Sequence, residues 1–241
     1  MLVLESDTGR AIALLEGSSL TAIRTGAASG AAIDLLARQD SKVVAIFGAG
    51  SQGRTQLEAA CTARSIETAF IYDRSPEKSK AFAEEMAGRY NIPKDVRVAK
   101  SPKEAIEYAD IICTATTSAQ ALFDDKDVKS GTHICGIGAY TAEMQESPIE
   151  TVARARIVVD SYATVMDEAG DIVKAINAGL IKVTDIHAEL GEIILGRKPG
   201  RNTQHEVTFF KSVGNAVQDA TAAQLALTNA RAMKIGTEVE F

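Results

Sequence analysis

A glycine-rich turn between an apolar run and a helical pattern is the part of the sequence best suited to chemistry. Residues 43–53 read Val-Val-Ala-Ile-Phe-Gly-Ala-Gly-Ser-Gln-Gly, which places Gly48, Gly50 and Gly53 at GxGxxG spacing. The first glycine permits a tight turn, the second lets backbone amides approach a pyrophosphate, and the third permits close packing of helix on strand. The pyrophosphate of a dinucleotide is then expected at the positive N-terminus of the helix.

An acidic residue ends the next apolar run, as a dinucleotide-binding unit requires. Asp73 lies at the position where a carboxylate hydrogen-bonds the adenosine ribose hydroxyls, which favours NAD(H). Arg74 follows it and could instead meet a 2′-phosphate, so the residues leave NADP(H) open. This order of strand, glycines, helix, strand and acid predicts coenzyme contacts for Gly48, Ala49, Gly50, Ser51, Gln52, Asp73 and Arg74.

The bulk composition limits the class of protein and its partners. The chain has 241 residues, of which 46% are hydrophobic and 24% charged, as in a soluble globular protein. A net charge of −6 without a dense Lys/Arg tract argues against nucleic acid or an anionic membrane as the main partner. No apolar run reaches the roughly 18–20 residues that span a bilayer, and the first residues do not form a secretion signal.

Cysteines and histidines give no metal signal. Cys61, Cys113 and Cys135 lack metal-ligand spacing and are interpreted as buried, reduced thiols of a cytoplasmic protein. The three histidines are scattered, and His133 within a strand pattern is expected to be a hydrogen-bonded residue of the sheet. The sequence therefore predicts no metal site.

Apolar and helical patterns alternate along the chain. Residues 2–6 and 11–16 are expected to form a β-hairpin, and residues 18–38 a helix with Ser18 or Ser19 as its N-cap. Further strands are predicted at 42–47, 68–72, 96–99, 110–114, 131–137, 156–159 and 206–211. Further helices are predicted from the glycine turn to about 64, from 75, and at 101–108, 149–153, 165–178 with an interruption at Gly170, and 215–233. This alternation predicts an α/β protein with a doubly wound, mainly parallel Rossmann sheet.

Five segments together resemble the ornithine cyclodeaminase/mu-crystallin family, which includes archaeal alanine dehydrogenases and ketimine reductases. The resemblance runs through nearly the whole chain and is clearest in residues 20–29 (LTAIRTGAAS), 48–52 (GAGSQ), 72–74 (YDR), 131–138 (GTHICGIG) and 210–216 (FKSVGNA). It implies binding of NAD(H) or NADP(H) and hydride transfer that interconverts an amino acid and its imino form. It also implies a small amino or imino acid substrate and a homodimer.

The resemblance implies roles for residues outside the glycine turn. Arg24 is expected to hold the substrate carboxylate, because a planar guanidinium can donate two parallel hydrogen bonds. Without the resemblance, Arg24 would be a solvated helix residue, the threonines after the fourth core strand would be solvated loop residues, and Ile137 would belong to the core. The further coenzyme contacts that we expect are Thr25, Thr114, Thr116, Ile137 and Ser212.

Tyr140 departs from the family pattern. In the cyclodeaminase and alanine dehydrogenase branches an aspartate stands there and handles the substrate amine, whereas here Gly138-Ala139 leads into tyrosine. Tyrosine brings no charge near neutral pH, since its ordinary pKa is about 10. Ornithine cyclisation is therefore disfavoured, while imine reduction keeps Tyr140 or a water as proton donor. Glu143 or Glu146 could replace the missing carboxylate, although loop acids are more often solvated.

Family members also carry an α/β segment ahead of the position matching Met1, with a lysine and further arginines of the pocket. We therefore interpret residues 1–39 as the remnant of a substrate and dimerisation lobe, residues 40–212 as an NAD(P)-binding Rossmann domain, and residues 213–241 as a helical segment returning to the small lobe. Three functions are carried forward: an NAD(P)-dependent amino/imino acid oxidoreductase, an ornithine cyclodeaminase releasing proline and ammonia, and a non-catalytic NAD(P)H-binding protein or one part of a split enzyme.

Overall fold

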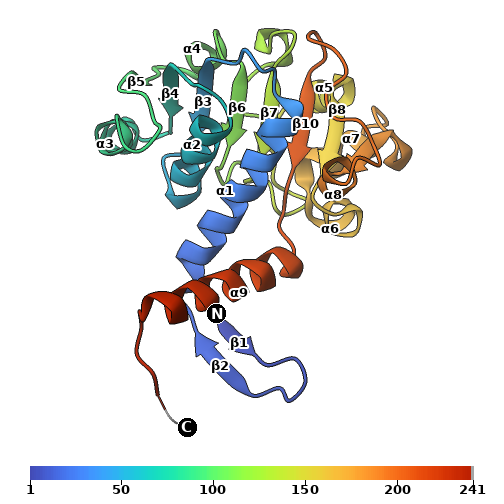
Figure 1. The fold of residues 1–241 in the computed structure, drawn as a ribbon. Helices are drawn as coiled ribbons and strands as arrows, with labels where there is room; N and C mark the ends of the chain where they lie inside the picture. Colours follow the sequence, from blue (N-terminus) through green and yellow to red (C-terminus); the bar gives the residue numbers. More distant parts are fainter. Residues whose placement is uncertain (240–241) are drawn as a thin grey trace.

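The computed structural model describes residues 1–239 and has an eight-stranded sheet at its centre (Figure 1). Every neighbouring pair of strands in this sheet is parallel, and the strand order is β5-β4-β3-β6-β7-β10-β8-β9. The strands are β3 (Val43–Phe47), β4 (Thr68–Tyr72), β5 (Val96–Val98), β6 (Ile111–Thr114), β7 (His133–Gly136), β8 (Arg156–Val159), β9 (Ile186–Glu189) and β10 (Thr208–Lys211). The predicted doubly wound α/β class is confirmed.

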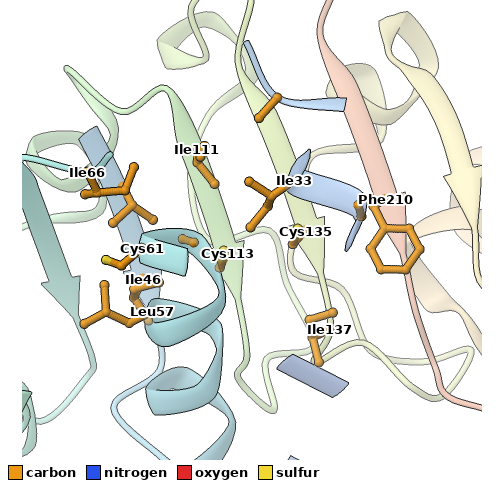
Figure 2. Packing of buried hydrophobic residues seen from close by; sticks show 14 of the residues in the cluster. Ile33, Ile46, Leu57, Cys61, Ile66, Ile111, Cys113, Cys135, Ile137 and Phe210 are labelled. Carbon is orange, nitrogen blue, oxygen red and sulfur yellow. The ribbon is translucent and has the colours of Figure 1, made fainter. Parts of the chain in front are cut away.

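Helices cover both faces of the sheet, and each face has its own apolar core. One core joins the strands to α1 (Gly17–Leu36), α2 (Ser51–Ala63), α3 (Pro76–Met86) and α8 (Leu190–Ile194). The other joins them to α4 (Pro102–Ile106), α5 (Ile149–Arg154), α6 (Tyr162–Glu168) and α7 (Gly170–Asn177). Both faces are buried, so the central strands are mainly apolar: β3 is apolar throughout, and β6 is apolar up to its last residue, Thr114. Figure 2 shows part of the first core, with Ile33, Leu57 and Phe210 among its members.

Close contact between α1 and α2 depends on small side chains. A Cβ at Gly26 would lie 2.9 Å from the carbonyl oxygen of Thr55, so only glycine fits at this crossing. The C-terminal end of α1 is closed by Arg64, which donates to the carbonyl oxygens of Ile33, Asp34 and Ala37. These bonds satisfy carbonyl groups that lack partners within the helix. The α1 helix is thereby fixed on the sheet face that carries the glycine turn.

The hairpin and the last helix lie beyond the sheet. Strands β1 (Leu2–Leu4) and β2 (Ala11–Leu14) pair antiparallel, and α9 (Ala216–Met233) packs against α1 (Figure 1). Two short 3-10 turns, Asp125–Asp127 and Val183–Asp185, complete the elements. No helix within residues 1–239 has the length and apolarity needed to cross a membrane.

Several predicted boundaries differ from the structure. The N-cap of α1 is Glu16, whose carboxylate accepts from the amides of Ser18 and Ser19, so the prediction of a serine cap was wrong. The predicted helix 165–178 is interrupted as expected and forms α6 and α7, which meet at Ala169, but α6 already begins at Tyr162. Strand β9 and helix α8 were not predicted, because β9 (IHAE) is no continuous apolar run and α8 (LGEII) is five residues long with a glycine at its second position.

Candidate functional site

A cavity of about 310 Å³ opens where loops leave the carboxyl ends of four strands. In an open α/β sheet, ligands bind at this edge, at the point where the strand order reverses. Here the chain runs from β3 outward to β5 and returns to the other side of β3 with β6, so the reversal lies between β3 and β6. The lining residues are Thr21, Arg24, Thr25, Gln52, Ala115, Thr116, Thr117, Ile137, Gly138, Tyr140, Ser212, Val213 and Gly214.

The glycine turn after β3 forms an open cradle at the start of α2. Gly48 has φ +100°, and a Cβ there would lie too close to the carbonyl oxygen of Ala115. A Cβ at Gly50 would meet nothing within 4 Å, so open space lies against this backbone. Gly50 is also the N-cap of α2 and offers no side-chain cap to the helix amides. This geometry suits a pyrophosphate at the helix N-terminus.

Asp73 lies beside that turn, as the sequence predicts. One carboxylate oxygen accepts from the amide of Ala49 at 2.9 Å and the other from the amide of Ser75 at 3.0 Å. Each oxygen keeps a further lone pair for another donor. Arg74 is exposed and is not among the residues that line the cavity, and Ser51 is exposed at the first turn of α2. Asp73 thus connects the end of β4 to the glycine turn.

Arg24 enters the cavity from α1 and is held by α9. Its Nε donates to Asp219 Oδ1 at 2.9 Å and its Nη1 to Gln218 Oε1 at 3.1 Å. The side chain is only 13% exposed, in contrast to a solvated helix arginine. Gly214 leaves room for it, because a Cβ there would lie 2.5 Å from Nη1. The neighbouring Thr25 also lines the cavity, and its hydroxyl donates to the carbonyl oxygen of Thr21.

Ser212 lies at the cavity on the turn after β10. Its hydroxyl donates to Asp160 Oδ2 at 2.7 Å, and the same oxygen accepts the amides of Val213 and Gly214. The other oxygen of Asp160, Oδ1, is buried and has no hydrogen-bond partner within residues 1–239. The sequence interpretation missed Asp160, although an acid at the end of an apolar strand is the signal that identified Asp73.

The loops after β6 and β7 are joined by Glu146. Its carboxylate accepts from the hydroxyls of Thr114 and Thr116 at 2.8 Å and from three backbone amides. Thr114 is fully buried by this contact and is not among the cavity-lining residues, in contrast to our expectation of a coenzyme contact. Burial raises the pKa of Glu146, whereas nearby Lys211 opposes the rise. Glu146 is thus neither a solvated loop acid nor a residue that lines the cavity.

Tyr140 and Ile137 line the cavity beside each other on the β7 loop. Tyr140 is 48% exposed and Ile137 8% exposed, and Ile137 also belongs to the core shown in Figure 2. Gln52 lines the cavity, and its side-chain Oε1 is buried with no hydrogen-bond partner among the described residues. Within residues 1–239, no aspartate or glutamate lines the cavity, and no cluster of side chains is suited to a metal ion.

His133 is hydrogen-bonded within the sheet, as expected. Its Nδ1 lies 2.8 Å from the hydroxyl of Thr208, and its Nε2 lies 3.3 Å from the thiol of Cys135. Burial and the nearby Arg201 and Arg64 charges lower the pKa of His133 to about 3. This imidazole is therefore neutral at physiological pH and lies at the amino end of β7, away from the cavity.

A larger hollow lies between α1 and α2, away from the strand ends. Its volume is about 550 Å³, and small side chains such as Ala27, Ala31 and Ala59 form much of its lining. Its acidic residues, Asp34 and Glu58, do not converge with the glycine turn. The smaller cavity is therefore the better candidate for chemistry, because coenzyme- and substrate-type residues from several strands meet there.

Fold and cavity together define a doubly wound α/β protein with a ligand cleft at its switch point. The profile of the ornithine cyclodeaminase/mu-crystallin family matches residues 1–234, and the chain belongs to this family. It is 42% identical over 243 residues to a Delta(1)-pyrroline-2-carboxylate reductase of Bacillus cereus, with 100% of this chain and 74% of that protein covered.

Two solved structures are similar in fold and sequence. The Delta(1)-pyrroline-2-carboxylate reductase of Thermococcus litoralis, in complex with NADH and L-proline, has a TM-score of 0.95 and 44% identity, covering 99% of this chain and 73% of that chain. An archaeal alanine dehydrogenase dimer with bound NAD has a TM-score of 0.92 and 34% identity, covering 100% and 73%. Both likenesses extend over the whole sheet.

Proposed function

We propose that the chain is an NAD(P)-dependent oxidoreductase that interconverts a small amino acid and its imino form at the cavity on the β3–β6 switch point. The observation that carries the proposal is the convergence of Arg24, Ile137, Tyr140 and Ser212 on one cavity beside the open glycine turn. Relatives named as reductases and dehydrogenases of this kind support it.

The glycine turn fits the coenzyme. Open space against Gly50 and the uncapped start of α2 would hold the pyrophosphate, and Asp73 would accept the ribose hydroxyls. NAD(H) supplies or accepts the hydride when bound. NADH and NAD in the two solved relatives support NAD(H), and exposed Arg74 leaves NADP(H) as the second choice.

The chain's own residues position the substrate. Arg24 would hold the carboxylate through guanidinium hydrogens not used by Asp219 and Gln218. Tyr140 would orient the imine nitrogen and donate a proton to it, or hold a water that does so. Ile137 and Thr116 would exclude water from one side, and Ser212, held by Asp160, would set the edge of the site.

Imine reduction is favoured over ornithine cyclodeamination. A carboxylate facing the substrate amine is the feature that the cyclodeaminase pattern provides, and among residues 1–239 no acidic residue lines this cavity. Glu146, which the sequence offered as a replacement, accepts five hydrogen bonds from the protein. The cavity therefore matches a cyclic imine carboxylate better than a diamine.

The exposed apolar residues of the hairpin and α9 support a homodimer. We also propose the division into a small lobe (1–39), a Rossmann domain (40–212) and a helical segment that returns to the small lobe (213–241). Leu4 and Leu14 are 53% and 81% exposed, and Val217 and Leu225 of α9 are 73% and 61% exposed. Apolar groups exposed together mark association surfaces. The dimeric alanine dehydrogenase supports the same assembly. Three buried, unpaired thiols support a reducing, cytoplasmic location.

Turnover distinguishes the three functions. Oxidation of NADH or NADPH by Δ1-pyrroline-2-carboxylate, with formation of proline, is the expected result. Ammonia and proline formed from ornithine with NAD would instead select the cyclodeaminase. Coenzyme binding without turnover of any cyclic imine, or of an α-keto acid plus amine, would select the non-catalytic protein, unless addition of a separate upstream α/β segment restores activity and shows a split enzyme.

A further inference from the structure

A single buried carboxylate connects the two loops that follow β6 and β7. Glu146 Oε1 accepts from the amide of Thr116 at 2.6 Å, and Oε2 accepts from the amides of Gly138 and Ala139 at 2.6 and 3.2 Å. The hydroxyls of Thr114 and Thr116 donate to the same carboxylate at 2.8 Å. Backbone amides only donate, so an acceptor with two oxygens is required between the loops.

The two loops touch so closely that their relative position depends on this contact. A Cβ at Gly138 would overlap the carbonyl oxygen of Thr116 and the carboxylate of Glu146. Thr116 and Thr117 of one loop and Gly138 and Tyr140 of the other line the cavity. A shift of one loop against the other would therefore change the shape of the site itself.

Glu146 is held in turn by a buried ion pair between Asp171 of α7 and Lys211 of β10. Asp171 Oδ1 accepts from the amides of Glu146 and Ser147 at 2.8 and 3.0 Å. Asp171 Oδ2 lies 3.4 Å from Lys211 Nζ, and neither side chain is exposed to solvent. Lys211 is the last residue of β10 and immediately precedes Ser212. Its charge compensates the two buried carboxylates of Asp171 and Glu146.

We propose that Glu146 is a positioning residue of the site: it fixes the Thr116 loop against the Gly138–Tyr140 loop, with Asp171 and Lys211 holding it in place. The part of this inference that concerns the affinity for coenzyme rests on the proposed function, whereas amide exchange does not depend on it. It assigns Glu146 no contact with substrate or coenzyme. Its effect is exerted through five donors and reaches Tyr140 through the backbone.

The test compares Glu146→Gln with Glu143→Gln, since Glu143 is an exposed acid of the same loop. Glutamine keeps the size of the side chain and places an NH₂ group against amide donors. In the protein without coenzyme, hydrogen exchange followed by NMR should become at least about tenfold faster at the Gly138 and Ala139 amides of Glu146→Gln, with Ile46 in β3 as the reference for global unfolding. The Kd for NADH should rise at least about tenfold.

Equal exchange at Gly138 and equal Kd in both variants would overturn the inference, even if Glu146→Gln melts earlier. If Glu146→Gln does not fold, Thr114→Val removes one donor only, and a smaller change of the same sign is expected. An unchanged Thr114→Val would then count against the inference. If the wild-type chain binds neither NADH nor NADPH, the proposed function fails, and amide exchange alone decides the role of Glu146.

Discussion

The guanidinium of Arg24 donates from Nε to Asp219 at 2.9 Å, which ties the helix before the glycine turn to the last helix of the chain. These residues are 195 positions apart in the sequence. With Nε given to Asp219 and Nη1 to Gln218, Nη2 carries no hydrogen bond to the described residues. The ion pair fixes the orientation of the planar guanidinium at the cavity. A carboxylate that binds to it is therefore held in one defined geometry.

Replacement of Arg24 by lysine tests this geometry. Arg24→Lys keeps the charge and loses the planar fork, so the KM for Δ1-pyrroline-2-carboxylate should rise at least about tenfold, or about 1.4 kcal/mol. The Kd for NADH should change much less. Steady-state kinetics and coenzyme titration measure the two quantities, with Arg10→Lys on the exposed hairpin as control. An unchanged KM would show that Arg24 does not hold the substrate.

Asp73 should determine the choice of coenzyme. Its carboxylate lies at the glycine turn and would repel a 2′-phosphate, whereas it accepts hydrogen bonds from ribose hydroxyls. Asp73→Asn should raise the affinity for NADPH relative to NADH by about tenfold. Titrations of wild type and variant with both coenzymes measure the ratio. A ratio that stays constant would place the ribose elsewhere.

The buried pair Lys211–Asp171 should dominate stability in its region. Lys211→Met leaves two buried carboxylates without a cation, and about 3–5 kcal/mol of the free energy of unfolding should be lost. Lys42→Met removes the exposed partner of Glu67, so it should cost about 1 kcal/mol or less. Urea denaturation of both variants checks the difference. An equal loss of unfolding free energy in both variants would mean that the buried pair stabilises the protein no more than an exposed one does.

His133 should make the protein less stable in mild acid. Its pKa of about 3 in the folded chain lies below the ordinary value of 6.5, so the unfolded chain binds the extra proton. The stabilisation is full above pH 6.5 and is lost as pH falls toward 3. Between pH 7 and pH 5 the free energy of unfolding should fall by about 2 kcal/mol from this group.

Urea denaturation of wild type, His133→Gln and His205→Gln across that pH range isolates the contribution of His133. His205 is exposed, so His205→Gln should retain the dependence while His133→Gln loses it. A wild-type stability that is flat between pH 7 and pH 5 would mean that the buried imidazole does become charged in the folded protein.

Local patterns predicted the cradle, whereas contacts across the sheet stayed hidden. Strand 68–72 and the glycine turn follow from apolar runs and spacing. The helices predicted from 75, 101 and 215 begin at those positions, where the structure has the N-caps Ser75, Ser101 and Asn215. The bond from Ser212 to Asp160 depends on β10 lying beside β8, although β9 and α8 separate them in the chain. No periodicity encodes that insertion, so the contact of Asp160 with Ser212 and the role of Glu146 could not be predicted, although the place of Asp160 after an apolar strand is visible in the sequence.

The central claim is that the cleft beside the glycine turn binds a nicotinamide coenzyme. The chain has no tryptophan, so the emission of NADH itself is the signal to titrate. We predict saturable binding at one site per chain, lost when Gly50→Glu places a carboxylate in the open space of the cradle and retained in Gly9→Ala on the hairpin. Failure of both NADH and NADPH to bind the folded wild-type chain at millimolar concentration, or undiminished binding by Gly50→Glu, would contradict the account.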